Sequence, residues 1–516
     1  MKPLANAKAV CLALLSALLL VLSFPTFDFH FLAWIGLVPL FIALRDKSPM
    51  WGFALSFLTG MTFLMGIFYW INIVNGFKWT NFLVLGIYFG SYFGLVGLGV
   101  NFVRQKGNIS LALAAPVLWV SMEYARSHAG FLGLPWALLG HSQYLNLPLI
   151  QIASITGVYG ISFLIVLVNV ALSEFLGNLP GSLKLTLVTI SVLGLSVLYG
   201  VDVISKPPST PKMRVSVIQG NIPQEIKWEP QWREHNMAKH IKLTKDAVHG
   251  GHASLVVWPE TSVPGNLTQD FNLLHALGDL ANASRADLVV GSSVRPKFGS
   301  RQFRMEHRFN SAFLISPERA VVSEYKKIRL LPFSEYLPYR GSFPWTERLT
   351  SASGNFLAGK EHTLFAASGV KFGVVICWES IFADFFRNFV KKGAQFMVNI
   401  TNEARFEETA APYQFLAMNV FRAVENRRSI ARSANTGISG FIDPYGRIIG
   451  VIKDAFGKEI FVEGHLTKEI PLSKELTLYT LYGDIFAYGN LVALVLVIVV
   501  SIGRGYSVGR GKTNSF

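Results

Sequence analysis

Eight long apolar runs restrict the fold of this chain more than any other feature of its sequence. They centre on residues 9–25, 30–45, 52–75, 81–103, 109–125, 156–177, 184–202 and 485–503. A helix needs about 20 mostly apolar residues to cross a bilayer. With 51% hydrophobic residues, 15% charged residues and a mean hydropathy of +0.39, the chain is too apolar for an ordinary soluble enzyme. The sequence therefore predicts a membrane protein with eight helical spans.

The first run resembles a signal peptide in position, but its flanks favour a retained helix. It lacks a small-residue cleavage site, and further spans follow at once. Basic residues then predict the orientation, because they favour cytoplasmic loops. With a cytoplasmic N-terminus, the short outside loops carry only Lys78 and Arg126. The inside segments carry Lys2, Lys8, Arg45, Lys47, Arg104, Lys106, Lys184, Arg504, Arg510 and Lys512. We therefore expect both termini inside and residues 205–480 outside the cytoplasm.

The extramembrane segment differs in composition from the rest of the chain. A proline-rich linker, SKPPSTPK, precedes β-branched runs that alternate with amphipathic helical stretches. This alternation predicts an α/β sandwich large enough for its own core. We expect strands near 214–219, 254–258, 286–292, 308–316, 319–325, 371–377 and 395–400, and helices near 234–249, 271–284, 380–391 and 411–427. The expected domains are residues 1–204 with seven spans, the α/β domain 205–480, and residues 481–516 with the eighth span and a cytoplasmic tail.

The charge of the α/β domain indicates what it contacts. Residues 205–480 contain 35 Lys and Arg against 26 Asp and Glu, a net charge of +9. A basic domain tethered to a bilayer should lie against anionic lipid head groups. Nucleic acid is not an expected partner, because the tether and the predicted compartment both oppose it.

Cys377 is the single thiol of this domain and follows an apolar strand in VVICWES. No internal disulfide is therefore possible in residues 205–480. No Cys/His cluster has the spacing of metal ligands either, since His235 and His240 are five residues apart. A free cysteine often only fills core space. The nearby Glu379 favours a chemical role, because a carboxylate contributes nothing to the packing of a thiol.

Two further stretches also place ionisable groups after apolar runs. VVWPETSVP carries Glu260 after a strand that ends at Pro259, and YKKIRLLPFSEYLP carries Lys326, Lys327 and Glu335. Taken singly, each fits a solvated loop carboxylate or a surface lysine. Together they supply what thiol acyl transfer needs: a base for the thiol proton, a thiolate that attacks an ester carbonyl, and a cation for the oxyanion.

At these residues the chain resembles the apolipoprotein N-acyltransferases, membrane enzymes whose extracytoplasmic domain belongs to the nitrilase (carbon-nitrogen hydrolase) superfamily. The resemblance covers nearly the whole chain. Its motifs, in order, are GLPWALLGHSQY, VSVIQGNIPQEIKW, VVWPETSVP, LLPFSEYLP, VVICWES and APYQFLAMNVFRAVENRRSIARSANTGISGFIDPYGR, followed by the lone C-terminal span. Such a set in this order is highly specific, and it implies a nitrilase-like α-β-β-α sandwich outside the membrane.

The resemblance also implies roles for individual residues. Glu260 matches the general base, Lys327 the oxyanion-stabilising lysine and Cys377 the nucleophile. The register favours Lys327 over Lys326, because the family lysine precedes the glutamate of its Pro-Phe-x-Glu-Tyr motif by eight residues. That glutamate, Glu335, resembles the supporting glutamate of the superfamily. Three further positions match residues that line the family's active site: Trp228, Trp378 and Glu379.

The family mechanism fits the thiol chemistry. Cys377 would take a fatty acyl group from a membrane phospholipid, with phosphatidylethanolamine as the expected donor, and form a thioester. The amino group of the diacylglyceryl-cysteine of an apolipoprotein would then accept the acyl group. The family and the topology imply a bacterial inner membrane with the catalytic domain in the periplasm, and they imply no cofactor or metal. The oligomeric state stays open at this point, with a monomer as the default. The stretch GSFPWTERL, with Phe343, Pro344 and Trp345, fits either an arm that dips toward lipid or a loop packed on its own domain.

The sequence departs from the family at several positions. Many members have Asn-Asp-Ala-Trp-Phe-Gly after the strand near 395–400, where this chain has Asn402, Glu403, Ala404, Arg405, Phe406 and Glu407. Trp378 replaces a common tyrosine, and Ser334 replaces a common glycine. Arg405 makes a substrate-facing surface cationic instead of aromatic. These departures concern the choice of donor or acceptor, because the Glu-Lys-Cys set is intact.

Two alternatives rank below the acyltransferase. A membrane-tethered amidase or nitrile hydrolase, in which water resolves the acyl-enzyme, leaves the membrane half unexplained. A transporter with a regulatory domain would bury ionisable groups in mid-span, but Glu123 and Glu174 fall near the predicted span ends. GRGKT at 509–513 lacks the glycine spacing and the strand of a phosphate-binding loop.

Overall fold

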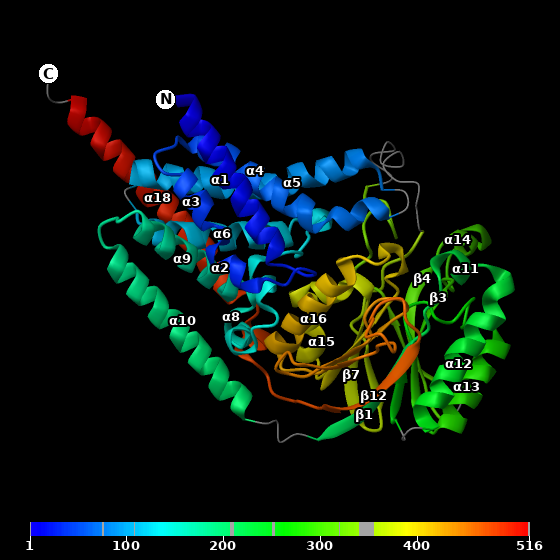
Figure 1. Ribbon diagram of the computed structural model, residues 1–516. Helices are drawn as coiled ribbons and strands as arrows, with labels where there is room; N and C mark the ends of the chain where they lie inside the picture. Colours follow the sequence, from blue (N-terminus) through cyan, green and yellow to red (C-terminus); the bar gives the residue numbers. More distant parts are fainter. Residues whose placement is uncertain are drawn as a thin grey trace. The chain divides into compact units, whose positions relative to one another are not determined.

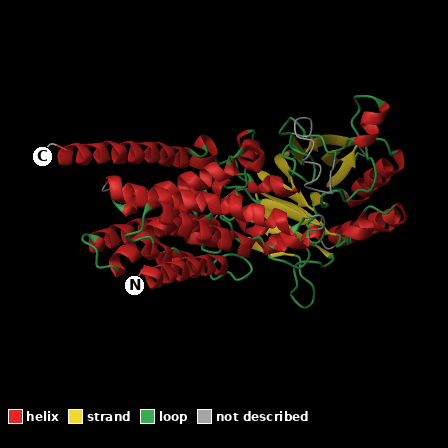
Figure 2. Cartoon of the chain, turned by 90° about the horizontal axis from the view of Figure 1, so that it is seen from above, coloured by secondary structure: helices red, strands yellow, loops and turns green. Residues whose placement is uncertain are grey.

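The computed structural model describes residues 2–74, 77–107, 109–206, 211–249, 253–318, 320–339 and 355–513. The chain divides into two compact units. A helical unit comprises Met1–Asn72, Lys78–Lys206 and Tyr482–Phe516, and an α/β unit comprises Ile73–Phe77 and Pro207–Leu481. Strands occur only in the α/β unit among the described residues (Figure 2). The GSFPWTERL segment lies outside the described residues.

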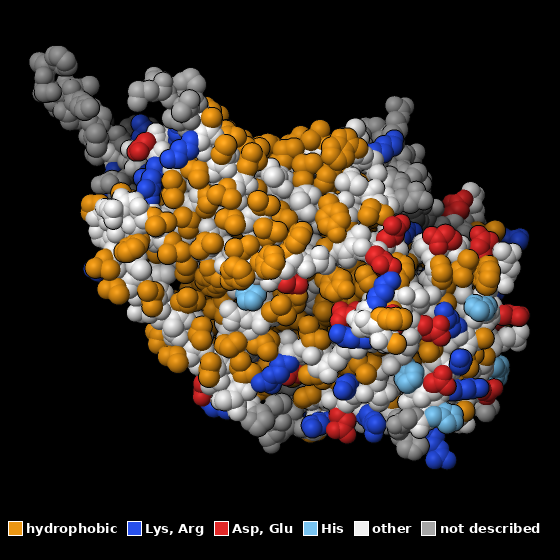
Figure 3. Space-filling model, viewed as in Figure 1, with side chains coloured by type: hydrophobic (Ala, Val, Ile, Leu, Met, Phe, Trp, Pro, Cys, Tyr) orange, Lys and Arg blue, Asp and Glu red, His pale blue; other side chains and the backbone are white. Residues whose placement is uncertain are grey.

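The helical unit is built from long apolar helices joined by short helical pieces. Its long helices are α1 (Lys2–Leu22), α4 (Pro49–Ile67), α5 (Trp79–Phe102), α6 (Leu111–Ser127), α9 (Val158–Leu176), α10 (Ser182–Ser205) and α18 (Ile485–Thr513). Its short helices are α2 (Ala33–Gly36), α3 (Val38–Ala43), α7 (Leu147–Ile150) and α8 (Ala153–Thr156). Apolar side chains dominate the face of this unit in Figure 3, as expected of surface that contacts lipid.

Five helices within the described residues are long and apolar enough to cross a membrane: Pro49–Ile67, Trp79–Gly107, Val158–Leu176, Ser182–Ser205 and Ile485–Arg504. The other three predicted spans have shorter apolar helices. The run at 30–45 divides into α2 and α3, whereas the run at 109–125 forms the 17-residue α6 with Pro116 inside it. In α1 the apolar part is Asn6–Leu22.

Small residues let α4 and α5 approach closely. A Cβ added to Gly97 of α5 would lie 2.2 Å from the carbonyl oxygen of Gly52 in α4, and one added to Gly90 would lie 3.0 Å from the carbonyl oxygen of Phe57. Any larger side chain would push the two backbones apart. The helical unit therefore holds these helices by close backbone packing, which is typical of association inside lipid.

The α/β unit contains two six-stranded sheets. The first has the order β12-β1-β2-β3-β4-β5 and the second the order β11-β10-β9-β8-β7-β6. The strands of the first sheet are β1 (Lys212–Gln219), β2 (Leu255–Val257), β3 (Asp287–Val294), β4 (Phe309–Ile315), β5 (Val321–Lys326) and β12 (Gly464–Pro471). Those of the second are β6 (Leu364–Ala367), β7 (Val370–Ile376), β8 (Phe396–Thr401), β9 (Ile430–Ala434), β10 (Gly440–Ile442) and β11 (Ile448–Val451).

In each sheet the central strands are parallel and the outer strands antiparallel. β1, β2 and β3 are parallel, as are β7, β8 and β9, so their carboxyl ends lie at one edge of each sheet. The two sheets pack face to face, with β1 against β9 and β4 against β7. The side chains that follow β2 and β7 can therefore meet. This arrangement positions the candidate site.

Helices cover the outer face of each sheet and complete an α-β-β-α sandwich (Figure 1). The helices α12 (Arg233–His249) and α13 (Phe271–Ser284) lie on the first sheet, and α15 (Ala383–Lys391) and α16 (Ala411–Asn426) on the second. The remaining helices of this unit are α11 (Gln224–Lys227), α14 (Arg301–Glu306) and α17 (Leu478–Tyr482). Buried side chains such as Val256, Leu277 and Leu288 form the core beneath α12 and α13. The predicted α/β sandwich is confirmed.

Candidate active site

A sharp turn presents Cys377 at the end of β7. The residue has a φ of 56°, in the left-handed region that side chains other than glycine rarely adopt, and it opens a 3₁₀ turn, Cys377–Ile381. Such backbone strain persists only where the surrounding contacts maintain it. The turn begins where β7 ends, so Cys377 does not continue the strand, and it is partly exposed.

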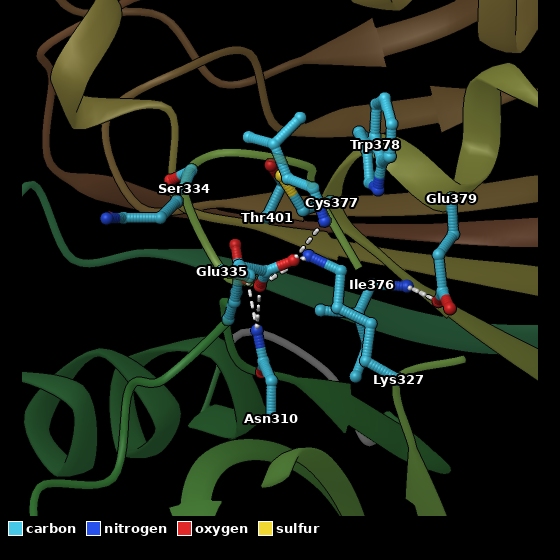
Figure 4. Close-up of polar contacts among 12 residues, drawn as sticks. Asn310, Lys327, Ser334, Glu335, Ile376, Cys377, Trp378, Glu379 and Thr401 are labelled. Atoms are coloured by element: carbon cyan, nitrogen blue, oxygen red, sulfur yellow. Dashed lines mark hydrogen bonds and ion pairs between the residues drawn. The ribbon is translucent and has the colours of Figure 1, made fainter. Parts of the chain in front are cut away.

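The Glu379 carboxylate supplies the contacts that maintain this turn. Its Oε2 accepts a hydrogen bond from the Ile376 backbone at 2.8 Å, and its Oε1 accepts from Ile328 and Arg329 at 2.7 and 3.0 Å. The Tyr325 hydroxyl donates to the same carboxylate at 2.9 Å. Figure 4 shows this carboxylate directed toward Ile376. Glu379 thus joins the Cys377 turn to the chain that follows β5.

Lys327 lies at the centre of the buried charges. It is 1% exposed, and its Nζ lies 2.8 Å from Glu335 Oε1 and 3.8 Å from Glu260 Oε1. Burial by itself lowers the pKa of this lysine, but Glu335, Cys377 and Glu260 outweigh it and hold the pKa above its usual range. Lys327 is therefore a permanent cation beside the thiol.

Asn310 and a close approach of two backbones fix the Glu260 carboxylate. Asn310 Nδ2 donates to Glu260 Oε1 at 2.7 Å and lies 3.3 Å from Glu335 Oε1 (Figure 4). A Cβ at Gly291 of β3 would lie 2.6 Å from the Pro259 carbonyl oxygen, so only glycine leaves room for the Glu260 segment. Both carboxylates thus have their positions set by neutral and cationic donors.

The surroundings of Cys377 keep its thiol protonated. Burial, together with the Glu260 and Glu335 carboxylates, raises its pKa to about 12, although Lys327 and a hydrogen bond with Thr401 act in the opposite direction. A thiol with this pKa is almost entirely protonated at neutral pH. It can attack a carbonyl only if a nearby base removes the proton during the reaction, and Glu260 is a carboxylate in its vicinity.

The structure thus brings Glu260, Lys327, Glu335 and Cys377 together and places the other predicted residues around them. Trp378 is buried and donates from Nε1 to the Arg329 carbonyl at 2.7 Å. Trp228 is 50% exposed and lines a cavity with Pro259 and Thr261. Lys326 instead pairs with Glu324 at 3.6 Å and is half-exposed.

Two functional candidates were missed from the sequence, Asn310 and Lys227. Lys227 is buried, and its Nζ donates to the Glu260 carbonyl at 3.0 Å and to Asn402 Oδ1 at 3.1 Å. Burial lowers the pKa of Lys227 to about 8. Asn310 interrupts the apolar run FNSAFLI with a polar side chain, a signal that could have singled it out. Among the residues that the structure describes, no group of three or more His, Cys, Asp and Glu side chains is arranged to hold a metal ion.

Comparison with known proteins defines the class first. Residues 214–469 match the carbon-nitrogen hydrolase family, and residues 16–171 match the N-terminal domain of apolipoprotein N-acyltransferases. Among solved structures, a variant of an amidase of the nitrilase superfamily from Nesterenkonia aligns with 55% of this chain and 96% of its own, at 20% identity and a TM-score of 0.38. The family match over residues 214–469 identifies the α/β unit as a carbon-nitrogen hydrolase domain.

Relatives that match the full length then define the family. An apolipoprotein N-acyltransferase from Geobacter metallireducens is 37% identical over 96% of this chain and 95% of its own length. Another from Chlorobaculum tepidum is 30% identical over 96% of this chain and 97% of its own. The chain belongs to the apolipoprotein N-acyltransferase family, and it is a membrane protein.

Proposed function

We propose that this protein transfers a fatty acyl group from a membrane phospholipid to the N-terminal amino group of the diacylglyceryl-cysteine of apolipoproteins. The observation that carries the proposal is the buried Lys327 ammonium, which lies 3.8 Å from Glu260 Oε1 and interacts electrostatically with Cys377. Base, cation and thiol of an acyl transfer thus occur in one place. The substrates in this proposal are inferred from membership of the apolipoprotein N-acyltransferase family.

In the first half-reaction, Glu260 accepts the Cys377 proton as the sulfur attacks the ester carbonyl. The carbonyl oxygen becomes an oxyanion, which the Lys327 ammonium stabilises. When the tetrahedral intermediate collapses, the ester C–O bond breaks and Glu260 returns the proton to the departing alkoxide. The products are a Cys377 thioester and a lysophospholipid.

In the second half-reaction, the acceptor amine attacks the thioester carbonyl, and Glu260 removes one of its protons. Lys327 again stabilises the oxyanion. Collapse breaks the C–S bond and returns the thiolate of Cys377, which recovers the proton from Glu260. The amide product is a triacylated lipoprotein, and the scheme is ping-pong.

Glu335 has a supporting role in this scheme. Its Oε1 accepts from Lys327 at 2.8 Å, and its Oε2 accepts from the Leu331 backbone at 2.7 Å. A bond to the backbone fixes the carboxylate, and the carboxylate in turn fixes the ammonium. The Lys327 charge is therefore already in place when the oxyanion forms.

The membrane half explains why such an enzyme is anchored. Donor and acceptor are both held in a bilayer by their acyl chains, so the catalytic domain has to be held at the bilayer surface as well. We propose phosphatidylethanolamine as the donor, a monomer as the active form, and a bacterial inner membrane with residues 205–480 on the periplasmic side. The loop charges described above support that orientation.

The test is the intact mass of the purified protein after incubation with phosphatidylethanolamine. The wild type should gain one fatty acyl group that hydroxylamine removes, and Cys377→Ala should gain none. Cys377→Ser, a close match in size, should show at most an adduct that resists hydroxylamine. If the folded wild type gains no adduct with any phospholipid, the proposal is wrong, and hydrolysis of a small amide becomes the better interpretation.

A further inference from the structure

The loop between β8 and α16 holds a single exposed arginine at the edge of the site. Its short 3₁₀ turn, Ala404–Phe406, lies between Glu403 and Glu407, whose φ values are 58° and 48°. Two residues other than glycine in the left-handed region strain this loop, so its surroundings must hold it. Buried Glu403 pairs with Arg432, which fixes the first of these residues.

One contact and the path of the chain place Arg405 beside the reacting groups. Its Nη1 lies 3.5 Å from the Ser334 hydroxyl oxygen, and Ser334 directly precedes Glu335. Thr401, whose side chain forms a hydrogen bond with the Cys377 thiol, is the last residue of β8, and the loop begins directly after it. Figure 4 shows Ser334, Thr401 and Cys377 at the same site.

The charge of Arg405 is available to a ligand. The described part of the chain provides no ion pair to this guanidinium. Two acids of the same loop are engaged elsewhere, because Glu403 pairs with Arg432 and Glu408 pairs with Lys458 at 2.6 Å. Glu407 is exposed, and no ion pair joins it to a described residue. An exposed, unpaired guanidinium next to a hydroxyl group offers the donors that a phosphate group accepts.

We propose that Arg405, with the Ser334 hydroxyl, binds the phosphodiester of the glycerophospholipid donor and makes it a better substrate than esters without phosphate. This inference rests on the proposed function, because it assumes that Cys377 takes its acyl group from a phospholipid. The ester and the phosphate of such a lipid are attached to one glycerol, so a phosphate follows the ester into the site. The Glu260 and Glu335 carboxylates would repel that phosphate, and the guanidinium offsets the repulsion.

The experiment compares two donors that differ in the phosphate. Full-length protein in a neutral detergent is mixed with dipalmitoyl phosphatidylethanolamine or with dipalmitoylglycerol, and acyl-enzyme formation is followed by intact mass below saturation. Arg405→Gln should slow acylation by the phospholipid about 10-fold, since one charge-assisted hydrogen bond has that value. Its rate with dipalmitoylglycerol should equal that of the wild type. Arg405→Lys keeps the charge without the planar fork, so its rate with the phospholipid should fall between those of the wild type and Arg405→Gln.

A matched control is Arg285→Gln. Arg285 is exposed and precedes β3, whereas Glu260 follows the carboxyl end of the neighbouring β2. This variant should match the wild type with both donors. A neutral micelle carries no anionic surface, so any loss at Arg405 reflects the donor and not a charged membrane.

The outcomes separate this inference from the proposed function. If Arg405→Gln slows both donors equally, or slows neither, the phosphate contact is refuted while acyl transfer stands. If the folded wild type forms no adduct with either donor, the proposed function itself fails and takes this inference with it. Transfer from a preformed acyl-enzyme to an acceptor amine should be unchanged in Arg405→Gln, because the donor phosphate has left by then.

Discussion

The two units of this chain use buried charged residues for different purposes. In the helical unit, Glu123 Oε1 accepts from the Leu139 backbone at 2.7 Å and from Trp119 Nε1 at 3.0 Å. Arg126 of the same helix donates to the Trp136 carbonyl at 2.8 Å. Both charges therefore satisfy the backbone of the irregular segment 133–144. Such a segment tolerates burial among membrane helices only when its polar groups have partners.

In the α/β unit, the central charges pair with one another and interact electrostatically with a thiol. Lys327 pairs with two carboxylates, Glu335 accepts from the Leu331 backbone, and Lys227 donates to the Glu260 carbonyl. Removing a charge from the first unit should thus lower stability, whereas removing one from the second should lower activity. Burial of a charge therefore does not by itself indicate catalysis, because the partners of the charge decide its role.

The largest expected effects belong to Glu260 and Lys327. Glu260→Gln and Lys327→Met should each reduce acyl transfer about 10²–10⁴-fold, because one removes the base and the other the oxyanion partner. The measurement is the single-turnover rate of adduct formation with phosphatidylethanolamine. A loss below about fivefold in either variant would contradict the assigned role.

The same two variants should differ in the reactivity of the thiol. The charge of Glu260 raises the pKa of Cys377 and that of Lys327 lowers it. At pH 8, Glu260→Gln should therefore speed alkylation by iodoacetamide, and Lys327→Met should slow it. The assay needs a Cys11→Ser background, because Cys11 is an exposed second thiol. A shift in the same direction for both would refute the electrostatic account.

His240 is a third kind of buried group, one that burial keeps neutral, and its effect on stability depends on pH. Burial, with a smaller contribution from the Lys227 charge, lowers the pKa of His240 to about 4, below its unfolded value of 6.5. Below pH 6.5 the unfolded state binds a proton that the folded state refuses. The free energy of unfolding should therefore fall as the pH falls from 6.5 to 4, by about 2 kcal/mol at pH 5.

The control for this pH effect is His240→Asn, whose amide can still donate to the Asn236 carbonyl that His240 Nδ1 contacts at 2.8 Å. Melting midpoints of both proteins are compared at pH 7 and pH 5. The wild type should lose more stability than the variant over this interval. Equal losses would show that His240 does not titrate as its burial predicts.

The charges of the helical unit should have a moderate effect on stability alone. Glu123→Ala leaves the Leu139 N–H and the Trp119 indole without their acceptor, which should cost about 2 kcal/mol. Glu123→Gln keeps an acceptor oxygen and should lose less. Thermal unfolding measures both, with the rate of adduct formation per folded molecule as the second readout. If a stable Glu123→Gln protein formed the adduct much more slowly than the wild type, Glu123 would not act on stability alone.

The smallest effect is expected at Lys326. Its Nζ lies 3.6 Å from Glu324 and 4.7 Å from the centre of the Phe309 ring, on a half-exposed side chain. Surface pairs of this kind contribute about 0–1 kcal/mol. Lys326→Met should therefore form the adduct at nearly the wild-type rate. A loss as large as that of Lys327→Met would mean that the wrong lysine has been assigned.

Seven strands could be predicted from their apolar or β-branched runs, whereas the five missed strands are short or lack such a run. All seven predicted strands are present, from β1 to β8, with β6 missed. The strands β9 to β12 were missed as well. β9 reads IARSA and buries Arg432, a residue that only its pairing with Glu403 makes compatible with a strand interior. β12 is found only through its pairing with β1, about 250 residues earlier.

The sequence by itself determined the membrane character, the alternation of strands and helices, and the presence of a thiol, a lysine and carboxylates after buried strands. These depend on composition and on periodicities of a few residues, which the chain carries locally. Tertiary structure alone decided that Lys327 contacts both carboxylates, that Glu379 supports the Cys377 turn, and that Asn310 and Lys227 belong to the site. The order of strands within the first sheet brings Glu260, Asn310 and Lys327 together, and the packing of the second sheet against the first adds Cys377 and Glu379. Neither arrangement can be read from short stretches of the chain.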